Sequence, residues 1–539
     1  MKFHLIAVLL FATIATSVIN GQATQNEFSF HLEATSIEGL GGIQSYAYGI
    51  YQGKWVIIGG RLDGLHRRQP FASFDNAGHN TKIWVVSPEE NKVWTRSLEG
   101  LDASITEQCR STNMQFAQRD SFLFLTGGYG YSDIEQDHTT FPFLTSINLP
   151  QLIAAILNEK IIAPAFHQVR DPKLQITGGR LIRLNDTFYL AGGHTFIGRY
   201  NPMGPDRGPG FIQNYSNSIL SFTILSDDTS LTIEHHRQWK DSLILHRRDL
   251  NVLPQRNAGG INEAIMFSGV FQNEEDLPYQ NAIRFSEKGF EEIKGFRQFF
   301  NHYHCATLGL FSARNDAMHN VFFGGIAQFT KENRKLIQDN DVPFTTSISR
   351  VSRVGQLPLQ EFLFNTTMPG YLGSGSELLL KENIPVFPEG IIDLDKLISD
   401  STHIGYIFGG IRSTAPSIFW TNEDHQSEAS FVVYKIYLIK QSHNSAILNP
   451  QSQSSILFSI NYNPETRYCW IDLELEKDQQ LSISISDEKG KKLIRKTKTF
   501  KAGKQEFAVT LKSMEIGQKL HFDLSNGKDS LSRSVIIRE

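Results

Sequence analysis

The sequence predicts an all-β fold built from repeated units. Two features of composition favour it: 42 glycines, and an aromatic fraction of 11% with 38 phenylalanines among 539 residues. Both are typical of a chain of many short strands and tight turns. The third observation is internal repetition, because a short apolar run that ends in two small residues recurs six times. These runs are Trp55–Gly60, Phe122–Gly128, Phe188–Gly193, Ala264–Gly269, Val321–Gly325 and Tyr406–Gly410.

Charge and cysteine content exclude several classes of protein. Lys and Arg number 52 against 56 Asp and Glu, a net charge of −4, and 40% of residues are hydrophobic. This balance excludes a disordered polyelectrolyte and gives no general attraction to nucleic acid or anionic membranes. Three cysteines allow at most one disulfide, so a small disulfide-stapled scaffold is also excluded.

The first residues resemble a secretory signal peptide. Lys2 precedes the apolar run Leu5–Ile14, and small residues follow up to Gly21. The alternative is a membrane anchor, but this run is shorter than the roughly 20 residues that a spanning helix needs. We therefore predict that residues 1–21 are a signal peptide and that the protein is exported, to the cell surface or the medium.

Each glycine-ended run is predicted to be the second strand of a four-stranded unit. Turn signals such as Gln52-Gly53 and Asn185-Asp186 precede the runs, which is typical of hairpins. Further strand-like segments follow most of them, for example Lys82–Val86 after the first run. In the first unit a turn at 87–91 then leads to a fourth strand at Lys92–Thr95.

This pattern resembles the kelch family of β-propellers. Twin glycines that end a strand, an aromatic third strand and a Trp-bearing outer strand are its signature, and the first unit matches with Gly59-Gly60, Trp84 and Trp94. The third unit matches with Gly192-Gly193, Phe222 and Trp239, whereas the others lack the outer Trp. Glycine pairs allow close approach between sheets that surround an axis. Six motifs imply a six-bladed kelch-like propeller over residues 22–440.

The ends of the propeller segment predict how its ring closes. The last unit shows no clear outer strand before the polar stretch 441–455, and Phe28–Glu33 alternates like a strand. We therefore expect this N-terminal strand to complete the last blade, which would remove an exposed sheet edge.

Candidate ligand-binding residues lie in the long connections and at the starts of the inner strands. Connections between second and third strands share one face with the connections between units, so their side chains can converge there. Arg and His suit an anionic or polyhydroxylated ligand. The candidates are Arg67, Arg68, Arg110, Arg180, His194, Arg248, Asp249, His302, His304 and Arg412.

His302 and His304 are predicted to alternate on a strand and so to face the same side. This spacing permits shared metal ligation, but two hydrogen-bonded structural histidines remain the favoured interpretation, because the sequence identifies no third ligand. No metal and no cofactor is therefore predicted, and catalytic residues are not identified.

Two catalytic propeller families share features with these candidates. Galactose-oxidase-like enzymes need a copper site with two His, two Tyr and a crosslinked Cys; Cys305 adjoins His304, but the tyrosines cannot be placed. Sialic-acid mutarotases are exported six-bladed kelch propellers with Arg and acidic residues in a funnel. We predict a binding or scaffold protein for a protein or glycan ligand, with a carbohydrate-active enzyme as the alternative.

Residues 456–539 are predicted to form a separate β-sandwich after a linker at 441–455. They also resemble the C-terminal sorting domain of type IX secretion cargo in Bacteroidetes, on the strength of Asn463-Pro464, Ser484–Leu493, Ala502-Gly503 and Ser532–Arg538. Tyr462 stands where that family has Pro, and Gly517–Leu520 replaces its Gly-x-Tyr strand. The resemblance implies export machinery as a partner and surface attachment; an accessory sandwich is the alternative.

Overall fold

The computed structural model describes residues 28–67, 73–201, 204, 210–226, 230–260, 262–332, 335–419, 425–440, 456–463, 468–475, 477–487, 490–511, 518–527 and 530–536. The predicted signal peptide and linker lie outside these residues. Strands dominate the fold, and among the described residues no helix is long and apolar enough to cross a membrane.

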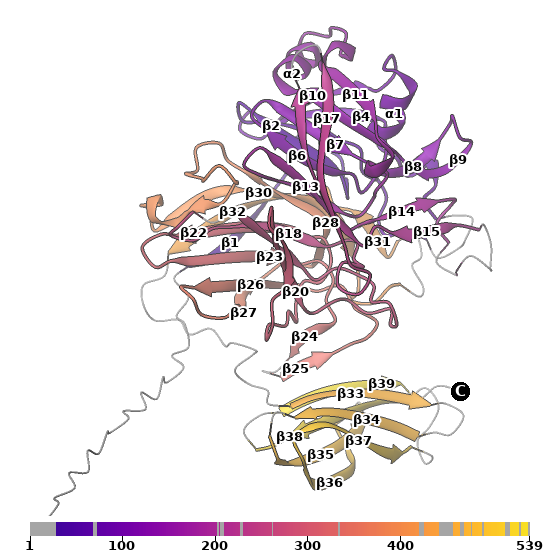
Figure 1. Ribbon diagram of the computed structural model, residues 1–539, viewed down its shortest axis with the longest axis vertical. Coiled ribbons are helices and arrows are strands. Elements are labelled where there is room, and N and C mark those ends of the chain that lie inside the picture. The colour runs from indigo at the N-terminus through magenta and orange to yellow at the C-terminus, as the bar shows by residue number, and fades with distance from the viewer. Residues whose placement is uncertain are drawn as a thin grey trace, which may run out of the picture.

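The first three glycine motifs lie in three successive antiparallel sheets (Figure 1). Their strand orders are β2-β3-β4-β5, β6-β7-β10-β11 and β12-β13-β16-β17. The strands are β2 (Ala47–Tyr51), β3 (Lys54–Ile58), β4 (Lys82–Ser87), β5 (Lys92–Ser97), β6 (Gln115–Arg119), β7 (Phe122–Thr126), β10 (Phe143–Asn148), β11 (Phe166–Arg170), β12 (Arg180–Leu184), β13 (Thr187–Ala191), β16 (Ser218–Ser226) and β17 (Leu231–Lys240).

The other three motifs lie in the sheets β18-β19-β20-β21, β22-β23-β26-β27 and β28-β30-β32-β1. Short β29 (Ile392–Asp393) adds to β22, and β31 (Ser427–Ala429) pairs with β30. The strands are β18 (Asn251–Gln255), β19 (Glu263–Phe267), β20 (Ala282–Ser286), β21 (Gly289–Glu292), β22 (Ala306–Ser312), β23 (Ala317–Phe323), β26 (Ser347–Val354), β27 (Gln360–Thr367), β28 (Tyr371–Leu380), β30 (Ser401–Ser413), β32 (Val433–Lys440) and β1 (Phe28–Thr35).

The N-terminal strand β1 pairs with β32 at the outer edge of the last sheet, as the sequence predicts. The pairing runs antiparallel from Phe28 opposite Lys440 to Thr35 opposite Val433. Phe28 and Phe30 are buried in the apolar cluster between this sheet and the preceding one. The two ends of the ring are therefore joined by backbone hydrogen bonds and by apolar burial.

The sheets form a closed ring. Inner strands β2, β6, β12, β18, β22 and β28 contact one another in this order, and the Tyr48 hydroxyl donates to the Leu378 carbonyl at 2.9 Å to join β2 to β28. An apolar cluster fills each gap between consecutive sheets, including the gap between the last and the first. A ring of small antiparallel sheets around one axis is a β-propeller.

The glycine motifs link neighbouring units through backbone hydrogen bonds. Both residues of every pair have positive φ, with Ser268 in place of the first glycine in the fourth motif. The second residue donates its backbone N–H to the next unit, at or shortly before its inner strand: Gly60 to Ser111 O (2.8 Å), Gly128 to Ile176 O (3.1 Å), Gly193 to Arg247 O (2.7 Å), Gly269 to His302 O (3.2 Å), Gly325 to Leu372 O (3.0 Å) and Gly410 to Ile43 O (2.9 Å). The close approach inferred from the sequence is thus observed.

Two hairpins outside the ring pair with each other. β8 (Tyr129–Ser132) and β9 (Asp137–Thr140) lie between β7 and β10, and β14 (His194–Ile197) and β15 (Ile212–Tyr215) lie between β13 and β16. Ile197 pairs with Thr139, so the hairpins form one sheet, β15-β14-β9-β8. The second-to-third connections of neighbouring units are thereby joined.

Among the described residues, two α-helices pack against the first two sheets. They are α1 (Ala103–Cys109) and α2 (Leu149–Leu157). The Asn148 side chain accepts a hydrogen bond from Gln151 N at 3.1 Å, an N-cap that starts α2 directly after β10. Leu149, Leu152 and Ile156 of α2 are buried in the cluster between the first two sheets.

The C-terminal unit consists of two antiparallel sheets that share one apolar core. One is β33-β34-β37, with β33 (Ile456–Asn463), β34 (Tyr468–Leu475) and β37 (Gly503–Thr510). The other contains β39-β38-β35-β36, with β35 (Gln479–Asp487), β36 (Lys492–Phe500), β38 (Lys519–Ser525) and β39 (Ser530–Ile536). The propeller hairpin β24 (Phe329–Glu332) and β25 (Lys335–Gln338) extends this second sheet next to β39 (Figure 1).

Replacing Gly324 by Ala is expected to destabilise the propeller by about 3 kcal/mol. A Cβ there would overlap the Leu372 carbonyl of the next sheet, and the residue has φ +65°. Gly100→Ala is the matched control, because Gly100 has φ +89° with nothing near its Cβ position, so only strain of about 1 kcal/mol is expected. Urea unfolding measures both, and equal losses would contradict a steric role for the motif.

Candidate functional site

A cavity of about 460 Å³ lies at the axis of the ring, and residues from all six sheets line it. Five units contribute residues just before their inner strands, namely Ser45, Asn113, Gly178, Asp249 and His304, and the last unit contributes Gly375 from within β28. These six occupy equivalent places in the six units. The cavity is thus a product of the whole ring and not of one loop.

A closed ring of six backbone hydrogen bonds forms the floor of the cavity. Each of the six residues donates its N–H to the equivalent carbonyl of the preceding unit. The bonds are Asn113 to Ser45 (3.1 Å), Gly178 to Asn113 (3.2 Å), Asp249 to Gly178 (2.6 Å), His304 to Asp249 (2.8 Å), Gly375 to His304 (3.0 Å) and Ser45 to Gly375 (2.8 Å). We call these six residues the floor ring. Because every N–H and carbonyl is paired, the floor is a rigid platform.

Connections between second and third strands form the walls. They carry aromatic side chains, among them Phe74, Phe196, Tyr200, Phe271 and Phe419, and Tyr303 adds another from the connection between β21 and β22. Tyr129, His194 and Phe196 come from the additional sheet of β8, β9, β14 and β15. The pairing of β9 with β14 therefore holds one side of the cavity in place.

Two arginines that line the cavity are paired with carboxylates. Arg248 forms an ion pair with Asp249, donates to the Tyr215 hydroxyl at 3.2 Å, and lies 5.1 Å from the ring centroid of Phe271. Arg61 is 2% exposed and donates from Nε to Asp63 at 2.7 Å. Its Nη1 is buried and has no hydrogen-bond partner among the described residues.

Two histidines of the wall are kept neutral. Burial and the neighbouring Arg248 lower the pKa of His66 to about 4, and the same two causes hold the pKa of His194 well below its usual range. Gln213 donates to His194 Nδ1 at 2.7 Å. Near neutral pH both imidazoles therefore act as neutral hydrogen-bonding groups.

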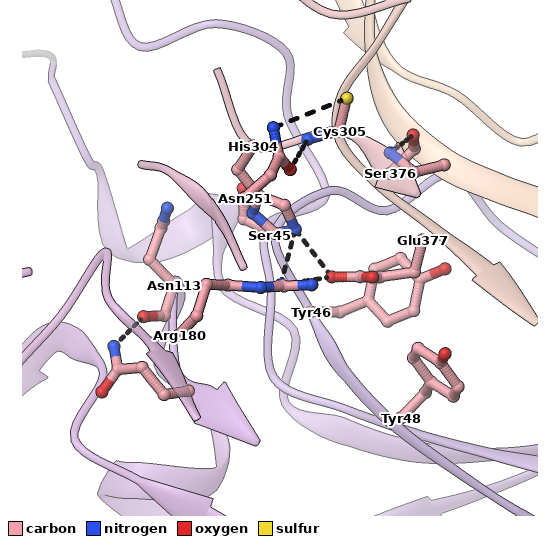
Figure 2. A network of polar contacts seen from close by, with 12 residues as sticks. Ser45, Tyr46, Tyr48, Asn113, Arg180, Asn251, His304, Cys305, Ser376 and Glu377 are labelled. Atoms are coloured by element: carbon pink, nitrogen blue, oxygen red, sulfur yellow. Dashed lines mark hydrogen bonds and ion pairs between the residues drawn. The ribbon is translucent and has the colours of Figure 1, made fainter. Parts of the chain in front are cut away.

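A buried ionic network meets the floor ring at His304 (Figure 2). Glu377 of β28 lies 2.7 Å from His304 Nε2 and 3.1 Å from Arg180 Nη1. Burial alone would raise the pKa of Glu377, but Arg180 and His304 outweigh it and hold the pKa below its ordinary value. Tyr46 and Tyr48 lie beside this carboxylate, and burial raises their pKa.

The structure places four of the predicted candidates on the cavity: His194, Arg248, Asp249 and His304. Arg180 lies beside the floor ring, where it contacts His304 Nε2 at 2.9 Å. Arg110 bonds to Asp133 at 2.6 Å, and exposed Arg412 bonds to Glu428 at 3.0 Å; neither lines the cavity. Arg67 is exposed and also absent from the lining, and Arg68 lies outside the described residues.

The prediction that His302 and His304 face the same side is wrong. Both precede β22, in a segment that bends at Tyr303 and His304, so the alternation of a strand does not apply. His302 is fully buried; its Nδ1 accepts from Gln328 N at 3.0 Å, and its Nε2 therefore donates to Gln298 O at 2.9 Å. It is a structural histidine.

Ser45, Asn113, Gly178 and Gly375 are the residues of the floor ring that the sequence interpretation missed. In the first three units the floor residue stands 15 positions before the second glycine, at Ser45, Asn113 and Gly178. This constant offset is a usable signal. The offset is longer in the fourth to sixth units, because the hairpin between the floor residue and the second glycine is longer there.

Metal ligation has no visible basis in the described part of the chain. Those residues contain no group of three or more His, Cys, Asp or Glu side chains that could bind a metal ion. Cys109, Cys305 and Cys469 are buried free thiols, and burial raises their pKa to about 12.

Neither a protein-family model nor a curated protein matches the chain. Among solved structures, one described as "Structure of YjhT" is 12% identical with a TM-score of 0.40, covering 77% of this chain and 99% of its own. An exo-1,5-alpha-L-arabinanase from a bovine ruminal metagenomic library is 7% identical with a TM-score of 0.27, covering 68% and 97%. Prolyl oligopeptidase B from Galerina marginata is 9% identical with a TM-score of 0.26, covering 84% and 56%. Sequence identities and TM-scores this low support no conclusion about activity.

His302 is expected to make stability depend on pH between about 6.5 and 4. Burial lowers its pKa to about 4 in the folded protein, whereas an unfolded chain has the ordinary value of about 6.5. As pH falls through this window only the unfolded state gains the proton, so stability falls, by about 3 kcal/mol in total. Urea unfolding of wild type and His302→Gln at pH 7.5 and pH 4 measures this.

Because other buried histidines titrate in both proteins, the difference between the two chains isolates His302. We expect the advantage of the wild type over His302→Gln to shrink by about 3 kcal/mol from pH 7.5 to pH 4. An advantage that does not change with pH would show that His302 is not held neutral.

Proposed function

We propose that this protein is an exported, six-bladed kelch-type propeller whose axial cavity binds a small polyhydroxylated ligand, such as a sugar. The six antiparallel sheets are the blades in this proposal. The observation that carries the function is the cavity itself, lined by all six sheets and combining aromatic rings with buried arginine, histidine, amide and carboxylate groups.

The size and shape of the site favour a small ligand over a protein. A volume of about 460 Å³ falls within the range of roughly 300–1,000 Å³ that small-molecule sites occupy. In this proposal the ligand enters and leaves by the face that carries the wall connections. A protein partner on that face would insert a side chain or a terminal sugar.

The charge pattern favours hydroxyl groups over a strongly anionic ligand. Arg248 is paired with Asp249 and Arg61 with Asp63, so neither cation is uncompensated. Asp276 and Asp341 add acceptors to the lining, and Asn113, Gln44 and Asn340 add amides. A set that contains both donors and acceptors suits sugar hydroxyls, each of which donates and accepts.

We further propose that residues 1–21 direct export and that the C-terminal unit is a β-sandwich that addresses the protein to export machinery and the cell surface. Two sheets around one apolar core are compatible with a sandwich. The resemblance at Asn463-Pro464 and Ser484–Leu493 supports the sorting role, and the localisation of a chain that lacks 456–539 tests it.

Phe271→Ala is expected to weaken sugar binding by about tenfold. An aromatic ring of the wall that packs against a sugar contributes about 1.4 kcal/mol, and Phe271 lines the cavity. The measurement is screening on a glycan array followed by titration calorimetry of the retained sugar. Phe431→Ala is the matched control, because Phe431 is 49% exposed and does not line the cavity.

Equal affinity of Phe271→Ala and wild type would place the bound sugar outside the axial cavity. Absence of any retained glycan would reject the proposed ligand class, whatever the cavity variants do.

A carbohydrate-active enzyme is the second candidate, and the His304–Glu377–Arg180 network favours it. His304 lines the cavity, and its Nε2 contacts the buried carboxylate of Glu377. A histidine that a buried carboxylate orients in this way is common in acid–base catalysis. In this alternative the buried pair orients His304 toward the hydroxyl groups of a bound reducing sugar.

His304→Gln and Glu377→Gln are expected to slow such a reaction by at least about 100-fold while sugar affinity changes little. Proton NMR of galactose or N-acetylneuraminate, prepared as single anomers and mixed with the protein, follows interconversion. Interconversion at the uncatalysed rate with wild-type protein would leave binding as the function.

A further inference from the structure

The outer edge of the C-terminal unit is occupied by the propeller. Strand β25 pairs in parallel with β39, with Ile337 opposite Ser532 and Gln338 opposite Arg533. Lys335 Nζ also lies 3.6 Å from Asp523 Oδ1 on β38. Hairpin β24–β25 therefore adds two strands to the C-terminal sheet and covers an edge that would otherwise be open.

The same hairpin is part of a segment that forms the cavity wall. It lies in the connection between β23 and β26, and residues on both sides of it line the cavity: Ile326 before it, and Asn340, Asp341 and Val342 after it. Only one residue separates Gln338, opposite β39, from Asn340 in the wall. The contact with the C-terminal unit and the contact with a ligand are thus neighbours in the chain.

Amide side chains connect these two contacts. Gln338 Nε2 donates to Asn340 Oδ1 at 2.7 Å, and Gln328 Nε2 donates to the same oxygen at 2.9 Å. Gln328 and Gln338 are both at least nine-tenths buried, so these hydrogen bonds are shielded from water.

Backbone hydrogen bonds make the base of the hairpin stiff. Asp339 N donates to Gln328 O at 2.7 Å, and Ala327 N donates to Pro343 O at 3.0 Å. His302 holds the segment before β24 in place: its backbone N–H donates to Ile326 O at 2.8 Å, and its ring accepts from Gln328 N. A displacement of β25 is therefore transmitted to the wall and not absorbed by a loose loop.

We propose that docking of the C-terminal unit on hairpin β24–β25 sets the position of the cavity wall at Asn340–Val342, so that docking and occupancy of the cavity are coupled. The coupling to occupancy rests on the proposed function of the cavity; the effect on the wall does not. Linkage makes the coupling reciprocal: a ligand that contacts the docked wall strengthens docking by the factor by which docking strengthens its own binding.

Hydrogen–deuterium exchange of the full chain tests the proposal without any ligand. Ser532→Pro removes a backbone donor from β39 in the C-terminal unit and leaves the propeller sequence intact. We expect amides of residues 339–342 to exchange at least about tenfold faster, whether this variant only undocks the unit or also unfolds it. Lys496→Pro is the matched control, on the opposite, exposed edge strand β36 of the same sheet, where proline is tolerated.

Unchanged exchange at 339–342 in Ser532→Pro, with faster exchange in β39, would overturn the proposal. Gln338→Ala provides a second test within the propeller, since it removes the amide link to Asn340 and retains the backbone of β25. It is expected to speed exchange at 339–342 while β39 stays protected. Protection of both segments in Gln338→Ala would show that the amide link does not carry the coupling.

A binding measurement tests the coupling to occupancy, with the glycan that the wild-type protein retains on the array as the ligand. Its affinity is expected to fall at least about fivefold in Ser532→Pro and to stay unchanged in Lys496→Pro. If no glycan binds, the proposed function fails while the exchange experiment still decides whether docking sets the wall. If a glycan binds equally to both variants, the coupling to occupancy is rejected and the binding function stands.

Discussion

Backbone hydrogen bonds between neighbouring sheets are the constraint on which the rest of this structure depends. The second residue of each glycine motif donates to a carbonyl of the following sheet. This geometry requires positive φ at two consecutive residues, a conformation that residues with a Cβ avoid. A second circle of hydrogen bonds, the floor ring, repeats the connection at the axis. Together they hold six separate sheets at a fixed spacing, and only then can residues from all of them line one cavity.

The fold could be predicted in large part because its signal is local and repeated. A glycine pair after an apolar run is visible in five units, with Ser268-Gly269 in the fourth, and strand-like segments follow most of these runs. The pairing of Phe28–Thr35 with β32 was also predictable, because the last unit lacks an outer strand of its own. Ser268 shows the tolerance of the pattern, since a serine adopts the left-handed conformation there.

The site was harder to predict, because its contacts join residues that are distant in sequence and because the floor ring is joined through backbone atoms. Glu377 meets Arg180 across 197 positions, a contact that no spacing rule contains. Ser45, Gly178 and Gly375 contribute N–H and carbonyl groups, which every residue has, so residue type gives no sign of their role. His302 was misplaced because alternation was assumed in a segment that bends before β22 begins.

The sheet formed by β8, β9, β14 and β15 has an evolutionary consequence. Here the hairpins of the second and third units share backbone pairing through Ile197 and Thr139, and one of them carries His194 and Phe196 of the cavity wall. An insertion that displaces Ile197 or Thr139 would break this pairing. These two units are therefore expected to change length together, and natural variation in ligand preference should arise first in the connections of the fourth and sixth units, which have no such partner hairpin among the described residues.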